Sequence, residues 1–279
     1  MIARDMLMMT PTQAHKWTDK ELRALERRIK AEYTKAYKEM FADMAAIMAK
    51  IETTPDMSLQ KKMVQLRKYD RLKKMAEQLA TVLQDATKTA ESFISDSAVN
   101  VYRNNYNASA DGLGFSLIDN TAVKKILTKE VNPFTKLSMQ GITDKVVLKR
   151  KLESEIITAI LKGESIPKMS ARLKQVAELS LRNTVRIART ETTRIENAAR
   201  NEVGAEGKKK GFVMWKRWVS TDDGRTRPEH LDANRQEVPY DEPFEVGDEK
   251  LMYPGDISLG ASAGNVINCR CTMVTFIKE

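Results

Sequence analysis

Hydrophobic residues recur at steps of three and four over most of the first ninety positions. One run extends from Leu22 to Ile51 and a second from Leu59 to Ala86. This spacing places apolar side chains on one face of a helix. Thr18 with Glu21 three residues later predicts a capping box at the start of the first helix. "TTPDMS" at 53–58 separates the runs, so the sequence predicts a long antiparallel helical hairpin.

The next segment, "RNNYNASADGLGFSLIDN" at 103–120, is rich in Asn, Asp, Ser and Gly. Such a composition predicts a loop between structural units. Helices are then expected near 121–128 and 144–161, the second ended by Gly163. A short helix is expected to start at Ser165 or Ser170. A last helix is expected over 183–202, ending at Gly204 and Gly207.

The pattern changes after position 210. "GFVMWKRWVS" has the β-branched and aromatic character of a strand, "TDDGRTRPEH" has turn chemistry, and "NVINCRCTMVTFI" predicts a second strand. Pro254-Gly255 predicts a type II turn that brings Asp256 back over the sheet.

The predicted fold is therefore α+β. Its N-terminal two-thirds are mainly α-helical and contain the long helical hairpin, and a small C-terminal α+β domain carries a short antiparallel sheet. The predicted domains are a hairpin over 1–102, a loop and helical connecting region over 103–180, and the α+β domain over 181–279.

Composition narrows the class of protein. Hydrophobic residues make up 42% of the 279 positions, which is enough for a packed core. Two cysteines exclude a disulfide framework and favour folding in a reducing cytoplasm. We find no apolar run near the roughly 20 residues that a transmembrane helix requires, so no membrane segment is expected.

The net charge of +9 is unevenly distributed. Residues 1–190 contain 34 Lys and Arg against 22 Asp and Glu, whereas residues 191–279 contain 13 against 16. A basic front indicates a polyanion or an acidic protein surface as partner, and solvated lysine faces are the alternative explanation. The candidate contacts to DNA or an acidic partner are Lys149, Arg150, Lys151, Lys208, Lys209 and Lys210.

Four motifs of the last ninety residues occur in a fixed order. They are "ARTETTR" at 188–194, "DDGRTRPEH" at 222–230, "MYPGD" at 252–256 and "NCRC" at 268–271. With a tryptophan-containing strand between the first two, the set resembles the C-terminal domain of the phage Mu protein F-like minor head proteins, also called phage head morphogenesis proteins. The resemblance is sharpest over 182–274.

That resemblance implies a bacteriophage minor capsid protein of the virion, located in the head interior or at the portal vertex. It implies a role in head assembly, DNA packaging or DNA delivery, with the host cytoplasm as the place of assembly. The partners it implies are the phage portal and other head proteins, packaged double-stranded DNA among the candidates, in a multi-copy assembly. We expect no enzyme activity and no catalytic residues.

The charged residues of these motifs are interpreted as a structural network. Arg189 can meet Thr193 and Glu196 on one helix face, and a buried arginine there would take acceptors from the "DDGRTRPEH" loop. A solvated helix face is the alternative. Arg225 and Arg227 suit phosphate or carboxylate recognition, and they suit internal salt bridges equally. The predicted network comprises Arg189, Glu191, Asp223, Arg225, Arg227, His230, Asn268 and Arg270.

The two cysteines lie on the last predicted strand. Cys269 and Cys271 would project to one face with Cα atoms about 6.5 to 7 Å apart, which is poor geometry for a disulfide. Two buried core thiols are one interpretation. The other is a zinc site with His230 as third ligand and Asp222 or Asp223 as fourth.

No cofactor is expected if the cysteines are core residues. The zinc interpretation carries the alternative function, a zinc-dependent hydrolase, nuclease or toxin-like effector built on His230, Cys269 and Cys271, with Glu191 as the base.

Overall fold

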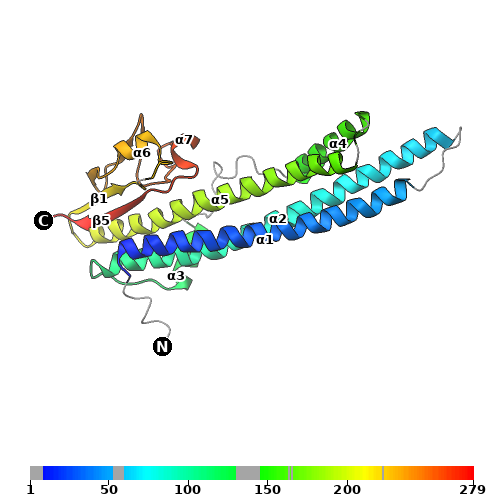
Figure 1. Ribbon diagram of the computed structural model, residues 1–279. Helices are drawn as coiled ribbons and strands as arrows, with labels where there is room; N and C mark the ends of the chain where they lie inside the picture. The colour runs from blue at the N-terminus through cyan, green and yellow to red at the C-terminus, as the bar shows by residue number, and fades with distance from the viewer. Residues whose placement is uncertain (1–8, 53–59, 130–144, 163, 165, 222) are drawn as a thin grey trace. The chain divides into compact units, whose positions relative to one another are not determined.

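The computed structural model describes residues 9–52, 60–129, 145–162, 164, 166–221 and 223–279. Five helices lead into the sheet region (Figure 1). They are α1 (Pro11–Glu52), α2 (Gln60–Asp111), α3 (Asn120–Lys129), α4 (Lys145–Leu161) and α5 (Ile166–Lys209). Helices before a small antiparallel sheet confirm the predicted α+β class. Among the described residues, every helix is too short or too polar to cross a bilayer.

The chain forms two compact units that each combine separate segments. The sheet unit comprises Met1–Glu26, Phe93–Gln140 and Arg186–Glu279, and the helical unit comprises Arg27–Ser92 and Gly141–Val185. These contact-based units differ from three consecutive domains. The predicted boundaries of independently folding domains stay a prediction.

Helices α1 and α2 are antiparallel, as the hydrophobic pattern predicted. In the sheet unit Asn105 donates its side-chain N–H to the Thr18 hydroxyl at 2.8 Å. In the helical unit Tyr33 and Thr87 share a hydroxyl hydrogen bond of 2.7 Å. A later residue of α1 therefore contacts an earlier residue of α2, as expected for antiparallel helices. The connecting "TTPDMS" segment lies outside the described residues.

Helix α1 begins earlier in the sequence than the predicted cap at Thr18. The helix begins at Pro11, where Thr10 and Gln13 form a reciprocal capping box: the Gln13 N–H donates to the Thr10 hydroxyl and the Thr10 N–H to the Gln13 amide oxygen. Thr18 is a buried residue inside the helix. The sequence carries this capping pattern at Thr10 and Gln13.

Residues 103–111 are helical, so the predicted loop is wrong over this part. Tyr102 and Tyr106 stack with ring centroids 6.4 Å apart and belong to the hydrophobic cluster of the sheet unit. Asn105 is fully buried and hydrogen-bonded. Packing therefore outweighs the weak helix propensity of the asparagines. The helix stops where Gly114 adopts φ +69°.

Helix α5 is one continuous helix, although the sequence predicted a short helix and a separate one over 183–202. Gly204 lies inside this helix. A glycine is needed at this position because a Cβ there would approach the Tyr240 ring to 2.5 Å. The helix ends at a Schellman motif, with Gly211 at φ +85° and the Phe212 N–H bonded to the Gly207 carbonyl at 3.1 Å. The internal glycines thus permit close packing and do not end the helix.

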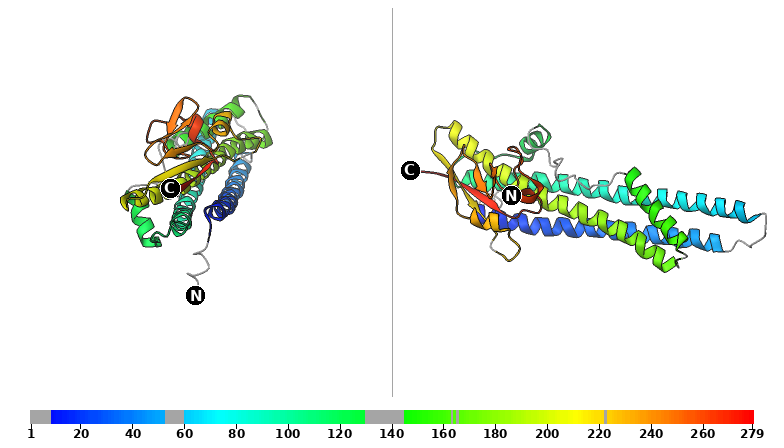
Figure 2. Two further views of the ribbon diagram at one scale, coloured as in Figure 1. Left: turned by 90° about the vertical axis from the view of Figure 1, so that its left-hand side faces the viewer. Right: turned by 90° about the horizontal axis from the view of Figure 1, so that it is seen from above.

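The sheet has the order β2-β1-β5 and both of its pairings are antiparallel. Its strands are β1 (Met214–Val219), β2 (Glu237–Pro239) and β5 (Thr272–Ile277). A separate hairpin joins β3 (Phe244–Val246) to β4 (Glu249–Leu251), and the short helices are α6 (Pro228–Asp232) and α7 (Ala263–Val266). Strands β1 and β5 lie beside the C-terminal half of α5 (Figure 2). A core built around Trp218, Phe244 and Met273 fills the sheet region.

The last strand is shorter than predicted. Residues 263–266 form α7, and β5 begins only at Thr272. Between them Asn268 adopts φ +57°, a left-handed conformation that asparagine tolerates better than most residues. Both cysteines therefore lie before the strand, on the turn that leads into it.

Candidate functional site

Helix α5 carries an unbroken buried segment over residues 191–200. Arg200 lies in it with 1% of its surface exposed. Its guanidinium donates to the Met273 carbonyl at 2.9 Å, the Pro11 carbonyl at 2.8 Å and the Asn105 amide oxygen at 2.9 Å, and lies 3.1 Å from Glu196. One side chain therefore links α1, α2, α5 and β5 within the sheet unit.

Glu196 is the counter-charge of this network. It also contacts His15 Nδ1 at 2.7 Å and accepts a hydrogen bond from the Thr272 hydroxyl at 3.0 Å. Burial lowers the pKa of His15, but the charge and the hydrogen bond of Glu196 outweigh it, so the pKa lies above its ordinary value. The network thus favours a charged His15.

Asn197 docks the same helix onto the start of β5. Its amide oxygen accepts from the Met273 N–H at 2.9 Å, and its amide nitrogen donates to the Cys271 carbonyl at 3.1 Å. One turn earlier, the Thr193 hydroxyl donates to the Cys269 carbonyl at 2.7 Å. The turn bearing the cysteines is therefore fixed to α5 through its backbone.

The structure separates the predicted partners of Arg189. Arg189 pairs with Glu26 of α1 at 2.6 and 3.1 Å and is 44% exposed, so its acceptor lies on α1 and not among the described residues of the "DDGRTRPEH" loop. Glu191 is buried beside Arg194 at 2.7 Å. The buried arginines of this helix are Arg194 and Arg200.

Residues of the "DDGRTRPEH" loop bind to one another and to the "NCRC" turn. Asp223 receives two hydrogen bonds from Arg270, at 2.5 and 2.7 Å, and one from the Arg225 N–H. The hydrogen bonds from Arg270 make the largest contribution to an Asp223 pKa that lies well below its usual range. Arg227 donates to the Ile267 carbonyl. Asn268 donates its N–H to the Thr190 hydroxyl at 3.1 Å.

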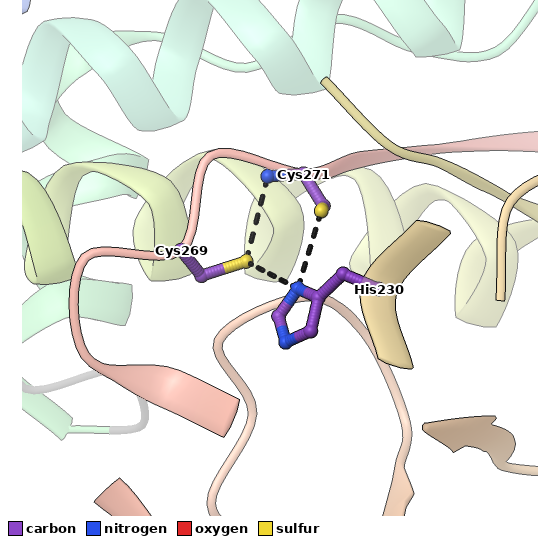
Figure 3. A group of neighbouring side chains, drawn as sticks. All are labelled: His230, Cys269 and Cys271. Carbon is purple, nitrogen blue, oxygen red and sulfur yellow. Dashed lines mark hydrogen bonds between the residues drawn. The ribbon is translucent and has the colours of Figure 1, made fainter. Parts of the chain in front are cut away.

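His230, Cys269 and Cys271 converge from α6 and from the turn before β5 (Figure 3). The His230 Nδ1 atom lies 3.3 Å from Cys271 Sγ and 3.6 Å from Cys269 Sγ. All three side chains are buried, and both cysteines are free thiols. A hydrogen bond from Cys269 and then the neighbouring His230 lower the Cys271 pKa to about 5, whereas the Cys269 pKa is raised.

The sulfur atoms meet at one nitrogen because the chain turns between them, and not because they share a strand face. Asp222 lies outside the described residues. Asp223 is held by Arg270, so in this arrangement it is not a fourth ligand beside the cysteines.

A pocket of about 460 Å³ opens beside this cluster. His230 and both cysteines line it, and five arginines give it a basic wall. Glu191, the proposed base of the zinc-enzyme alternative, does not line it. The arginines are Arg23, Arg189, Arg225, Arg227 and Arg270.

Lys216 was not singled out from the sequence. Its side chain is fully buried on β1 and donates to the Met252 carbonyl at 2.8 Å. Burial lowers its pKa to about 8, against the opposing effect of Asp256. Asp256 follows Gly255 at φ +86° and accepts the Met252 N–H, which agrees with the predicted turn. A lysine between two tryptophans on a strand was the available signal.

The candidate basic contacts are on the surface, and several are paired. Lys149 lies 3.2 Å from Glu77, Lys208 2.5 Å from Asp241 and Lys209 2.9 Å from Glu206. Lys210 lies over the Phe115 ring at 5.3 Å, and Arg150 and Lys151 are exposed. Such surface pairs contribute little to stability.

Comparison with known proteins gives three findings. A profile of the family described as Phage Mu protein F like protein matches residues 150–274. The Minor head protein GP7 of Bacillus phage SPP1 is 24% identical over 278 residues, which cover 94% of this chain and 85% of that protein. The NAD(+)--arginine ADP-ribosyltransferase EFV of Enterococcus faecalis is 28% identical over 130 residues.

The transferase match covers 47% of this chain and 26% of the transferase. No solved structure matches the chain significantly. The family profile lies over the α4–α5 region and the sheet, and the head-protein match includes the helical hairpin as well. The family profile and the head-protein match confirm the resemblance to the Mu F-like phage minor head proteins that was drawn from the C-terminal motifs.

Proposed function

We propose that this chain acts as a structural component of the phage head, associated with the portal or with packaged DNA during head assembly, packaging or delivery. The observation that carries the proposal is the match to a phage minor head protein along 94% of the chain. Similarity of that extent includes the helical front as well as the C-terminal motifs, so it supports a common role for the whole molecule. It also supports a place in the virion.

The chemistry of the sheet unit agrees with an architectural role. Two of its buried charged groups, Arg200 and Glu196, pair with each other, and Arg200 also donates to backbone carbonyls. Asp223 and Arg270 form a second such pair at the pocket. Groups used in this way hold segments together, and a paired carboxylate with a depressed pKa is a poor general base.

The basic front supplies the contact surface in this proposal. Arg150 and Lys151 are exposed side by side on α4 and belong to the part of the chain with the surplus of positive charge. Their charges would attract phosphates or an acidic protein face, and the attraction would weaken with salt.

Assembly of heads with and without the chain tests the proposal. We expect the chain to sediment with purified heads, and heads that lack it to differ in yield, DNA content or infectivity. A chain that neither enters heads nor binds any head component would refute the proposal.

A charge-reversal pair tests the contact surface separately. Arg150→Glu with Lys151→Glu should reduce binding to portal or DNA and flatten its salt dependence. The matched control is Arg235→Glu with Lys250→Glu, which changes the same charge at exposed positions of the acidic C-terminal part. Equal losses in both variants would show only a net-charge effect and would count against the α4 surface.

The absence of turnover stays a prediction, and the similarity to an ADP-ribosyltransferase gives it a direct test. Purified chain incubated with labelled NAD⁺ and an arginine-containing acceptor should leave the acceptor unlabelled. Transfer of label that depends on the chain would overturn a purely structural role.

A further inference from the structure

We propose that His230, Cys269 and Cys271 bind one zinc ion, with the fourth coordination position open to the adjoining pocket. The proposal is independent of the head role. It starts from the convergence of three buried side chains whose ligand atoms all lie within 4.8 Å of one another.

The spacing of these atoms fits a tetrahedral ion. Zinc binds thiolate sulfur at about 2.3 Å and imidazole nitrogen at about 2.0 to 2.1 Å, so tetrahedral geometry places N and S roughly 3.6 Å apart. The two observed separations between His230 Nδ1 and the sulfurs are 3.3 and 3.6 Å. An ion between them therefore requires shifts of a few tenths of an ångström at the nitrogen.

The surrounding hydrogen bonds select the tautomer of His230 that binds metal. Glu249 lies 2.9 Å from the Asn265 amide nitrogen, and a carboxylate accepts, so this end of the amide is its NH₂ group. The Asn265 oxygen then faces His230 Nε2 at 3.3 Å. The proton of a neutral imidazole consequently lies on Nε2, and the Nδ1 lone pair points at the sulfurs (Figure 3).

The same arrangement is poorly explained as an apolar core. One Nδ1 lone pair accepts from one thiol at a time, yet two sulfurs approach it. The Cys271 N–H also points at Cys269 Sγ at 3.4 Å, so this sulfur accepts a backbone hydrogen bond on its other side. A cation at the centre would satisfy both sulfurs and the nitrogen together.

The donor set and the pocket indicate which ion binds and how. Two soft thiolates and an imidazole favour zinc over magnesium or calcium, which take oxygen ligands. Three protein ligands leave one position, and all three side chains line the 460 Å³ pocket with its arginines. A water molecule or a small anion would complete the tetrahedron there. The ion would tie α6 to the turn that leads into β5.

The test is zinc analysis of the full chain purified under reducing conditions and exposed to a slight excess of Zn²⁺, then desalted. We expect about one zinc per chain for the wild type. Cys269→Ser, Cys271→Ser and His230→Gln should each lower the zinc affinity by at least tenfold. The chain's other histidine supplies the matched control, since His15→Gln should retain the full zinc content.

Cobalt binding to the unaltered chain makes the result independent of how the variants fold. Co²⁺ should give the intense visible bands of a tetrahedral site and a thiolate charge-transfer band, both removed by excess Zn²⁺. Asn265→Ala should weaken binding by about 10- to 100-fold, as loss of an orienting partner does. A folded chain with less than one tenth of an equivalent of zinc and no tetrahedral cobalt spectrum would overturn the proposal.

Discussion

The buried guanidinium of Arg200 gives the sharpest prediction of stability. Replacing Arg200 with Met keeps much of the side-chain volume and removes every polar contact. The change removes a donor from the carbonyls of Pro11 and Met273, and it removes the guanidinium charge that lies 3.1 Å from Glu196. Because the site is 1% exposed, water cannot replace the lost donors without opening the unit.

The expected loss follows from what remains. Breaking a buried ion pair by removing one partner costs about 3 to 5 kcal/mol, and a stranded buried acceptor costs about 1 to 3 kcal/mol. These costs overlap, and His15 and Thr272 still contact Glu196. We therefore expect Arg200→Met to lower the free energy of unfolding by about 4 kcal/mol. Against a typical total of about 5 to 15 kcal/mol, this is a large fraction.

Urea unfolding followed by tryptophan fluorescence is the assay. The three tryptophans, Trp17, Trp215 and Trp218, all belong to the sheet unit, so the signal reports that unit. The matched control is Arg189→Met on the same helix. Arg189 also pairs with a carboxylate of α1 but is 44% exposed, and its loss should cost less than about 1 kcal/mol. Equal, small losses for Arg200→Met and Arg189→Met would refute the reasoning.

Three further changes test other parts of the sheet unit. Gly204→Ala should lower the free energy of unfolding by about 1 to 2 kcal/mol because its Cβ would meet the Tyr240 ring. The same change in a Tyr240→Ala background should be neutral or stabilising. A higher free energy of unfolding for Gly204→Ala in the wild-type background would contradict the clash. The Lys216 pKa is about 8 in the folded chain and near 10.5 in the unfolded chain, so the unfolded chain binds more protons between these pH values. The free energy of unfolding relative to Lys216→Met should therefore rise by about 3 kcal/mol from pH 8 to 10.5. Paired denaturation curves measure this difference, and a difference that does not change with pH would refute the prediction. The pKa of His15 is raised in the folded chain, so its pairing with Glu196 stabilises the fold fully below pH of about 6.5 and is lost as pH rises through the folded pKa. The wild type should therefore have a higher thermal midpoint than His15→Asn at low pH, and this difference should shrink toward high pH. A difference that grows with pH would exclude this pairing.

Local patterns predicted the elements well and their ends poorly. Steps of three and four identified the hairpin, because its two helices bury a regular stripe. Glycines and asparagines gave the errors. Gly204 and Asn105 both read as helix breakers, and in the structure each is required inside a helix, one by the Tyr240 ring and the other by a buried hydrogen bond. Such requirements come from residues distant in the sequence.

The same distinction separates what could and could not be predicted of the candidate site. The "NCRC" and "DDGRTRPEH" motifs identified Asp223, Arg270, His230 and both cysteines, because each motif gathers its reactive side chains within a few positions. Their convergence depends on a short helix and a left-handed Asn268 that strand periodicity does not signal. A continuous strand would place the two thiols side by side on one face. In the structure both sulfurs instead lie near one imidazole nitrogen.

Arg200 shows why buried charge networks escape a reading of local sequence. Its side-chain acceptors lie at Asn105 and Glu196, and its carbonyl acceptors at Pro11 and Met273. Carbonyl acceptors leave no trace in residue type, since any amino acid supplies one. The motif "ARTETTRIENAAR" therefore looks like a polar helix face until the chain's two ends are brought against it. If that network is what closes the sheet unit, the N-terminal segment around Pro11 and His15 is part of the C-terminal fold. Removing residues 1–17 should then destabilise the sheet unit, although the truncated segment lies about two hundred positions before the first strand.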